Sequence, residues 1–444
     1  MPPLNVKIHT FGCQMNRLDS DLMEEALFAA GHRVVEDEDA ADLVVYNTCS
    51  VREHAEERVE QRVRQLPGRA LVAIAGCLAE RLGDKLFAML PRVNIVVGTK
   101  HFPEIADLAA RAAAGEKRVL AVGEGENAAP GVAAAHERSR HHGIEGYVSV
   151  MRGCDNFCAY CIVPYVRGRE ESRPAGEIVR EACNLAARGA VEITLLGQNI
   201  DAYGKHGGPN LAELLRRLDD AVPASVRRFR CVTSHPRDIT PELVQTVAER
   251  PRLAKHFHMP AQSGSTRVLQ AMRRGYDRAT YDGRLAMIRE LCPGALVTSD
   301  FIVGFPGETD ADFAMTEDLF RQARFQTAYV FKYSPRPGTW SEKNLPDDVP
   351  LAVKKERNFR LLKLQESIAL ERHQGLVGKT LGDVLVEGVS PRDPGKMLGR
   401  TSANLAGVGP APAAGGARPG DMVAVRVGRV SPLTLFGELA APGV

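Results

Sequence analysis

Residues 151–170 read MRGCDNFCAYCIVPYVRGRE and contain three of the nine cysteines in this 444-residue chain. Cys154, Cys158 and Cys161 follow a C-x3-C-x2-C spacing. Gly153, immediately before them, allows the backbone to turn tightly, so that three thiols can point at one centre. In a chain that does not look secreted, clustered cysteines of this kind predict a metal-binding loop.

Three cysteines are one ligand short of the commonest protein metal sites. Structural zinc sites and ordinary iron–sulfur clusters take four protein ligands. The next cysteine, Cys183, lies in an expected helix, and a zinc site would need His141 or His142 from an expected linker. The loop therefore favours a metal group with one open coordination position, which is a feature of catalytic sites.

The overall composition is that of a globular protein with enough apolar residues for several cores. Hydrophobic residues make up 44% of the chain and charged residues 25%, and the length suggests roughly three domains. Neither a signal peptide nor a membrane-length apolar run is apparent, which predicts a cytoplasmic protein without a membrane partner. In that compartment nine cysteines indicate metal binding or catalysis rather than disulfides. The net charge of +2 does not demand nucleic acid, and the arginine-rich residues 227–237 are expected to be a solvated surface.

Residues 4–116 alternate short apolar runs with a helical pattern. Strands are expected at residues 5–12, 42–49, 70–77 and 93–98, and a helix at 20–31 with Ser20 near its start. This alternation predicts a Rossmann-like parallel sheet covered on both faces. Cys13, Cys49 and Cys77 stand at or just after the ends of three strands, where such sheets bind ligands. We expect these thiols to share a site, although each alone is typical of a buried apolar position.

The central region, residues 144–374, follows residues 117–143, which are interpreted as a linker because they are rich in Gly, Ala and charge. Strands are expected at residues 146–153, 192–199, 228–234, 256–262, 296–306 and 328–334, and helices at 175–189, 278–292 and 308–323. Thr309 is the expected N-cap of the last helix. Six such units predict an incomplete (β/α)6 barrel with its chemistry at the carboxyl ends of the strands; a doubly wound open sheet is the alternative.

The tail, residues 375–444, changes character. Short alternating strands are expected at residues 381–390, 396–405, 421–431 and 433–440, with a low-complexity loop at 407–420. This pattern predicts a small antiparallel β-barrel. Its slight excess of basic residues supports RNA binding only weakly, and a capping role explains the tail equally well.

The cysteine loop, with Tyr160 between its last two cysteines, resembles the signature of the radical S-adenosylmethionine enzymes. The resemblance covers nearly the whole chain. The N-terminal cysteine motifs of the methylthiotransferase family are matched by TFGCQMN, YNTCSVR and IAGCLAE. The radical domain of that family is matched by LLGQNIDAYG, TSHP, QSGS, DFIVGFPGET and KYSPRPGT, and the tail resembles its RNA-binding TRAM domain.

The resemblance implies two [4Fe-4S] clusters and S-adenosylmethionine as cofactors. It assigns a radical cluster to Cys154, Cys158 and Cys161, and an auxiliary cluster to Cys13, Cys49 and Cys77. One S-adenosylmethionine would donate a methyl group to a sulfur on the auxiliary cluster. A second, bound to the open iron of the radical cluster, would yield a 5′-deoxyadenosyl radical that abstracts hydrogen from C2 of an adenine, which then takes up the methylthio group.

The segments CQMN, CSVR and LLGQN favour the branch of the family that acts on N6-isopentenyladenosine at tRNA position 37 and gives its 2-methylthio derivative. The alternative branches act on threonylcarbamoyladenosine in tRNA or on a ribosomal-protein aspartate. The implied partners are tRNA, a reduced flavodoxin or ferredoxin-type electron donor, and a sulfur donor. We expect a monomer.

Further site residues are expected at the strand ends. Contacts to S-adenosylmethionine are expected from Tyr160, Gly197, Gln198, Asn199, Ser234, Gln262, Ser263, Gly304 and Glu308. The candidate RNA contacts are Arg167, Arg169, Arg400, Arg426 and Arg429. The remaining cysteines, Cys183, Cys231 and Cys292, are interpreted as packed thiols, and His256 and His258 as interior hydrogen-bonding groups.

Overall fold

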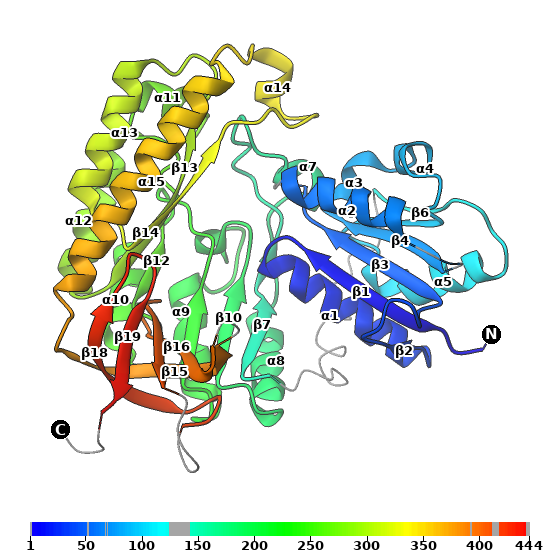
Figure 1. Cartoon of the computed structure of the whole chain (residues 1–444), viewed down its shortest axis with the longest axis horizontal. Coiled ribbons are helices and arrows are strands. Elements are labelled where there is room, and N and C mark those ends of the chain that lie inside the picture. The colour runs from blue at the N-terminus through cyan, green and yellow to red at the C-terminus, as the bar shows by residue number, and fades with distance from the viewer. Residues whose placement is uncertain are drawn as a thin grey trace.

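The structure is a computed structural model that describes residues 2–50, 53–66, 68, 70–123, 143–390, 393–410 and 417–440. Figure 1 shows an N-terminal sheet with its helices (blue to cyan), a central set of strands and helices (green to yellow), and a C-terminal barrel (orange to red). His141, His142 and most of the expected linker lie outside the described residues. No helix in the described ranges is long and apolar enough to cross a membrane.

The N-terminal region contains a six-stranded parallel sheet in the order β2-β1-β3-β4-β5-β6. Its strands are β1 (Asn5–Phe11), β2 (Arg33–Val34), β3 (Leu43–Thr48), β4 (Leu71–Gly76), β5 (Ile95–Val97) and β6 (Val119–Ala121). Its helices are α1 (Gln14–Ala29), α2 (Glu53–Gln65), α3 (Cys77–Leu82), α4 (Lys85–Met89), the 3-10 helix η1 (Phe102–Glu104) and α5 (Ile105–Ala113). Side chains of α1 and α5 pack on one face of the sheet and those of α2 and α4 on the other, so β3 is buried throughout. The chain changes direction across the sheet between β1 and β3, and parallel sheets bind ligands in the crevice at such a point.

Helix α1 begins earlier than the sequence pattern predicts. The prediction placed its start near Ser20, whereas the helix begins at Gln14. The Asn16 side chain accepts a hydrogen bond from the backbone N–H of Cys13 and so caps the helix from within its first turn. Ser20 lies buried one turn further on, where its hydroxyl contacts Thr10. The prediction was wrong because a serine that resembles a cap is an interior polar residue here.

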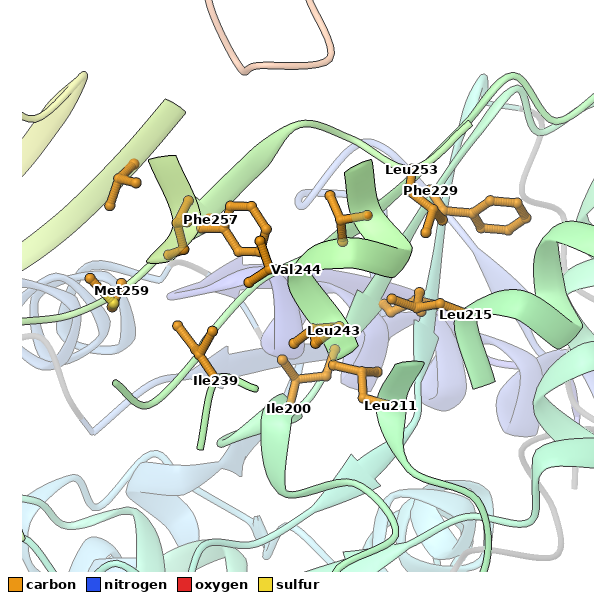
Figure 2. Close-up of a cluster of buried hydrophobic side chains, with 14 of the residues drawn as sticks. Ile200, Leu211, Leu215, Phe229, Ile239, Leu243, Val244, Leu253, Phe257 and Met259 are labelled. Carbon is orange, nitrogen blue, oxygen red and sulfur yellow. The ribbon is translucent and has the colours of Figure 1, made fainter. Parts of the chain in front are cut away.

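The central strands form two three-stranded parallel sheets, in the orders β11-β10-β7 and β12-β13-β14. They are β7 (Glu145–Ser149), β10 (Glu192–Leu196), β11 (Arg228–Cys231), β12 (His256–His258), β13 (Leu296–Val303) and β14 (Thr327–Lys332). A parallel bridge between Phe229 and Leu253 connects the two sheets, and Figure 2 shows these two side chains in the apolar core at the junction. Within each sheet the strand order follows the chain, without the reversal of a doubly wound sheet.

The connections between the central strands are mostly helical. The helices are α7 (Val163–Arg167), α8 (Ala175–Ala187), η2 (Ile200–Ala202), α9 (Leu211–Ala221), α10 (Pro241–Glu249), α11 (Thr266–Ala271), α12 (Arg278–Leu291), α13 (Asp310–Ala323), α14 (Trp340–Asn344) and α15 (Leu351–Gln374). Thr309 caps α13 as predicted, because its hydroxyl accepts a hydrogen bond from the Asp312 N–H at 3.2 Å. Two short strands, β8 (Met151–Arg152) and β9 (Glu171–Ser172), pair antiparallel around the cysteine loop.

The tail forms a closed five-stranded barrel in the order β15-β16-β17-β19-β18. Its strands are β15 (Thr380–Ser390), β16 (Asp393–Arg400), β17 (Ala406–Pro410), β18 (Met422–Val430) and β19 (Leu435–Leu439). Two details of the prediction were wrong. Strand β17 lies largely in the stretch interpreted as loop, because backbone pairing with β16 outweighs its Gly- and Pro-containing composition. In addition, β17 and β19 pair in parallel, so the barrel is not wholly antiparallel.

Buried arginines fasten the barrel to the central region. Arg228 donates to the backbone carbonyl oxygens of Arg400 and Asp383 at 2.9 and 2.6 Å. Arg230 donates in the same way to Thr401 and Ser402, and the Glu192 carboxylate accepts from both arginines. The expectation of a solvated surface at residues 227–237 was therefore wrong for these two arginines, which are buried in this interface.

Candidate metal centres and cofactor site

Three cysteines gather at the carboxyl ends of three neighbouring strands of the N-terminal sheet. Cys13 follows β1, Cys49 follows β3 and Cys77 begins α3 directly after β4. The backbone N–H of Cys49 donates to the Phe11 carbonyl at 3.0 Å, which draws two of these strand ends together. Gly12 has a φ of +143°, and a Cβ there would lie 2.6 Å from the Cβ of Cys49. A glycine is therefore required for the cysteines to approach.

An asparagine network supports this site. Asn16 accepts from the Cys13 thiol at 3.3 Å and donates to the Asn47 side chain at 3.1 Å. Asn47 in turn donates to the Asn16 carbonyl and to the Ser20 hydroxyl. All three polar side chains are buried, so the network fixes the loop after β1 against the end of β3.

The thiols of this site differ in acidity. A hydrogen bond with Cys49, helped by the positive charge of Arg167, lowers the pKa of Cys13 to about 6, although partial desolvation of its sulfur opposes this shift in an otherwise exposed residue. Burial raises the pKa of Cys77, and the nearby Arg167 only partly offsets this effect. The Cys13 thiol therefore loses its proton more readily than an ordinary thiol, whereas burial disfavours the thiolate of Cys77.

The central cysteine loop is held by its own backbone. Gly153 has a φ of +73°, and a Cβ there would lie 1.8 Å from the Arg169 carbonyl oxygen. The Cys154 N–H donates to the Gly168 carbonyl at 3.1 Å, and the Ala159 N–H donates to the Met272 carbonyl at 2.9 Å. The loop is therefore closed at its base and tied to the segment that follows α11.

The three thiols of this loop act on one another. Burial raises the pKa of Cys154 to about 11 and that of Cys161 to about 12, and the neighbouring Cys158 adds to both shifts.

In the described part of the chain no three cysteine sulfurs lie within 4.8 Å of one another. A single zinc ion needs sulfurs roughly 3.8 Å apart, given its Zn–S bonds of about 2.3 Å. As they lie in the described residues, neither set of sulfurs matches the spacing of one zinc ion.

Three buried oxygens near this loop accept no hydrogen bond from the residues that the structure describes, although the Lys205 ammonium lies 3.6 Å from one of them, on Glu170. Glu170 accepts from the Asp155 N–H next to Cys154 through one oxygen, and Asn199 donates to Glu170 and Asp238. The other Glu170 oxygen, together with the side-chain oxygens of Gln198 and Asn199, accepts no hydrogen bond within the described residues. Since buried acceptors are normally satisfied, this group fits a ligand that brings an ammonium donor, as S-adenosylmethionine does.

Other residues expected at the cofactor site have partners in the protein. Ser234 donates to Asp201, whose pKa burial raises to about 7. Ser263 accepts from the Ser265 N–H, and Glu308 pairs with buried Arg357 at 2.7 Å. Ser263 and Glu308 thus have partners that fix the strand ends, and their contact with the cofactor stays a prediction.

The remaining residues of that set shape the backbone or the loop. A Cβ on Gly197 would lie 2.8 Å from the Met151 side chain, and one on Gly304 would lie 2.3 Å from Lys354. Gln262 has a φ of +67°, and its backbone pairs with β13. Tyr160, within the cysteine loop, packs on a small apolar cluster, and its hydroxyl accepts a hydrogen bond from Arg274.

Among the residues expected to contact RNA, Arg167 does not have the exposed position that such a contact needs. Its guanidinium is buried, pairs with Asp19 and donates to the Cys77 sulfur, so it does not face solvent. Arg169 is exposed and pairs with Asp155, while Arg400 is half-exposed and pairs with Glu387. Arg426 and Arg429 are exposed on the barrel, as an RNA-binding role requires.

Sequence reasoning missed the residues that support the cysteines. Asn16 and Asn47 lie inside the quoted motifs CQMN and YNTC, so their closeness to cysteine was the available signal. Arg274 donates to the Cys158 sulfur at 3.2 Å from a position outside the quoted motifs. The sequence around Asp19 likewise contains nothing that indicates its contact with Arg167.

Comparison with known proteins agrees with this arrangement. Residues 5–98 match the model described as "Uncharacterized protein family UPF0004", and residues 148–320 match the Radical SAM superfamily. A solved structure of the radical S-adenosylmethionine methyltransferase TsrM from Kitasatospora setae has the same fold over 76% of this chain and 77% of that one. Its TM-score is 0.56 and its sequence identity 16%. The class defined by these matches is that of the radical S-adenosylmethionine proteins.

Relatives narrow the class to one family. The tRNA-2-methylthio-N(6)-dimethylallyladenosine synthase of Moorella thermoacetica is 41% identical over 443 residues, which cover 98% of both chains. The proteins of the same name from Anaeromyxobacter dehalogenans and Phocaeicola vulgatus are 43% and 41% identical, over 99% and 97% of this chain and 95% of each relative. The chain belongs to the family of tRNA-2-methylthio-N(6)-dimethylallyladenosine synthases, which confirms the resemblance found in its motifs.

Proposed function

We propose that the protein transfers a methylthio group to C2 of N6-isopentenyladenosine at position 37 of tRNA. The observation that carries the proposal is the presence of two separate sets of three cysteines, one at the carboxyl ends of three parallel strands and one on the loop after β7 and β8. Each set adjoins a glycine with a positive φ and a crowded Cβ position. One set accounts for radical chemistry, and the second accounts for a sulfur carrier. The family relatives name the substrate.

The two cysteine sets would each hold a [4Fe-4S] cluster with one open iron. When bound, these clusters and two molecules of S-adenosylmethionine per turnover supply one-electron cleavage, a methyl group and sulfur. The role of the chain's own residues is to bind these groups and to orient them. Gln198, Asn199 and Glu170 offer three unsatisfied acceptors for the ammonium group of S-adenosylmethionine.

A short helix joins the two sets. Helix α7 begins two residues after Cys161 and ends at Arg167, which donates to the Cys77 sulfur. A helix of five residues is about 8 Å long. The two clusters would therefore lie close enough for a base held between them to meet both.

An aromatic pair suits the extruded base. Tyr329 and Phe331 are about half-exposed, at 50% and 45%, on β14, the edge strand of its sheet. They alternate with Ala328 and Val330, which pack in the core, and Tyr329 contacts the ring of His258. Aromatic side chains bind unstacked bases by stacking. Phe331 pairs in register with Ile302, which packs on the same apolar cluster as Tyr160, so the platform is next to the radical loop.

The domain assignment follows from these roles. The predicted boundary at residue 116 is too early, because β6 (Val119–Ala121) belongs to the N-terminal sheet. The auxiliary-cluster domain therefore extends from residue 4 through β6, and the linker follows it up to residue 143. Residues 144–374 form an incomplete (β/α)6 radical barrel, and residues 375–444 a TRAM domain that grips tRNA. Arg400, Arg426 and Arg429 of the barrel and Arg169 beside the radical loop contact phosphates. The monomer works in the cytoplasm, where its tRNA is found, with a flavodoxin or ferredoxin-type electron donor and a separate sulfur donor.

Nucleoside mass spectrometry tests the proposal. A strain lacking the gene should lose 2-methylthio-N6-isopentenyladenosine and accumulate N6-isopentenyladenosine, and the wild-type gene should restore the modification. Loss of the methylthio group from threonylcarbamoyladenosine, or from a ribosomal-protein aspartate, would assign the protein to one of the other branches instead.

A further inference from the structure

One cysteine of each set accepts a hydrogen bond from a buried arginine. The Arg167 Nε donates to the Cys77 sulfur at 3.2 Å, and the Arg274 Nη1 donates to the Cys158 sulfur at the same distance. Arg167 is 9% exposed and Arg274 is 6% exposed. Arg167 ends α7, while Arg274 lies between α11 and α12, so the two contacts arise independently.

The two guanidinium groups differ in how their charge is compensated. Arg167 forms a two-pronged ion pair with Asp19, at 3.2 and 2.5 Å, and that carboxylate is buried. Arg274 donates its other hydrogen bonds to neutral groups, which are the hydroxyls of Tyr276 and Tyr160 and the carbonyl of Pro260. Within the described ranges Arg274 has no ion pair. A guanidinium with no contacting carboxylate among the described residues therefore lies at Cys158, whereas at Cys77 the Asp19 carboxylate offsets part of the Arg167 charge.

Charge and hydrogen bonds at a thiolate control how easily a cluster accepts an electron. Hydrogen bonds to the sulfurs and the net charge near the cluster are among the terms that set the reduction potential of an iron–sulfur cluster. A positive charge favours the reduced, more negative cluster, and burial strengthens the effect because the interior screens charge weakly. No carboxylate among the described residues contacts Arg274 to weaken this effect, whereas Asp19 offsets part of it for Arg167.

We propose that Arg274 is a positioning residue that raises the reduction potential of the cluster held by Cys158. The Arg167–Asp19 pair then holds Cys77 without a comparable shift. One electron from a low-potential donor of the flavodoxin or ferredoxin type enters the cluster at Cys158; the donor is oxidised by one electron and no bond breaks in this step. The inference rests on the proposed function, because it requires both clusters.

A redox titration followed by electron paramagnetic resonance tests the inference without turnover. The full chain carrying Cys13→Ala, Cys49→Ala and Cys77→Ala would be reconstituted so that only the cluster at Cys158 is present, and titrated with dithionite in the absence of S-adenosylmethionine and tRNA. Arg274→Gln should shift the midpoint potential to a more negative value. Arg274→Lys, which keeps the charge, should stay close to the parent.

The matched control removes the compensated pair. In a chain carrying Cys154→Ala, Cys158→Ala and Cys161→Ala, the double variant Arg167→Gln/Asp19→Asn should shift the remaining cluster's midpoint by less than Arg274→Gln shifts the other. An equal or larger shift would overturn the asymmetry between the two arginines.

The lysine variant keeps the inference testable if Arg274→Gln assembles no cluster. Arg274→Lys must then retain the parent's iron and sulfide content and its midpoint potential. An unchanged midpoint in Arg274→Gln, or a negative shift in Arg274→Lys as large as in Arg274→Gln, would refute a charge effect. If the wild-type chain itself assembled no cluster after anaerobic reconstitution, the proposed function would fail rather than this inference.

Discussion

Asp19 and Arg167 are 148 positions apart in the sequence and form a buried ion pair that joins α1 of the N-terminal region to the end of α7. The same arginine donates to the Cys77 sulfur. One side chain from the central region thereby reaches into the N-terminal cysteine site. The two cysteine sets are thus parts of one structure rather than sites on independent domains.

Removing one partner of this pair should destabilise the protein. Asp19→Ala leaves the Arg167 charge buried without a carboxylate, which typically costs about 3–5 kcal/mol. Urea denaturation of the apo-protein should show a correspondingly lower midpoint. As a control, Glu116→Ala breaks an exposed pair with Arg111, so its midpoint should barely move. A midpoint for Asp19→Ala equal to that of the control would contradict a stabilising role.

Gly153→Ala should empty the radical site while leaving the fold intact. The added Cβ would overlap the Arg169 carbonyl at 1.8 Å, and the φ of +73° is unfavourable for alanine, so the base of the loop must move. In the chain whose auxiliary cysteines are replaced by alanine, bound iron after reconstitution should fall to near zero. Gly176→Ala in α8, where a Cβ meets nothing within 4 Å, should retain full iron content. Normal iron in Gly153→Ala would show that the loop tolerates the shift.

In the apo-protein, Cys13 should be the first cysteine to react with iodoacetamide. It is exposed and its pKa is lowered to about 6, whereas Cys154, with a pKa of about 11, is buried. Its labelling rate should rise with pH and reach half its maximum near pH 6. Cys49→Ala removes the hydrogen bond that lowers this pKa and should move the midpoint toward that of an ordinary thiol.

The same shift affects stability. Because folding lowers the pKa of Cys13, the thiolate's contribution to stability is complete above the pKa of the unfolded thiol and disappears as the pH falls through about 6. In the iodoacetamide experiment, peptide mass spectrometry identifies the cysteine that has been labelled. Earlier labelling of Cys154 than of Cys13 would contradict the assignment.

Alanine at the aromatic platform should weaken substrate recognition. Loss of one base-stacking contact costs about 1–3 kcal/mol, so Tyr329→Ala or Phe331→Ala should raise the KM for tRNA roughly 5- to 150-fold. Formation of 5′-deoxyadenosine without tRNA should continue, and Tyr329→Phe should behave like the wild type. Phe359 on α15, also an exposed aromatic residue, provides the control. Equal effects of Phe359→Ala and Phe331→Ala would mean that the platform has no special role.

Charge reversal on the barrel should change the salt dependence of tRNA binding. Each phosphate contact removed lowers the slope of log affinity against log salt by about 1. Arg426→Glu and Arg429→Glu should therefore weaken binding and flatten this slope in a salt titration. Lys363→Glu on α15 makes the same change of charge at another exposed site. Unaltered affinity in the barrel variants would favour the capping interpretation of the tail.

The sequence predicted the fold well where local patterns and packing agree. Strands β1, β3, β4 and β5 were expected from apolar runs, because a sheet buried on both faces needs them. The start of α1 was missed because Cys13 and Asn16 replace the usual hydroxyl cap. Strand β17 was missed because its pairing partners, rather than its own residues, determine its conformation.

Of the groups that build the site, only the cysteines could be predicted from the sequence. Their spacing and their positions after strands follow from the sequence, but the surroundings of an arginine do not. Arg167 and Arg169 are two residues apart, yet one is buried against Cys77 and the other is exposed. Only tertiary contacts distinguish them, and the residues that make those contacts come from distant parts of the chain.

The docking of the C-terminal barrel has a consequence for sequence variation. Arg228 and Arg230 hold the barrel mainly through the backbone carbonyls of residues 383 and 400–402. Every amino acid supplies the same carbonyl, so side chains at these four positions can be exchanged without removing those hydrogen bonds. The side chains on the outer surface of the barrel can therefore vary while its attachment stays constant, and barrels from relatives should be exchangeable as modules.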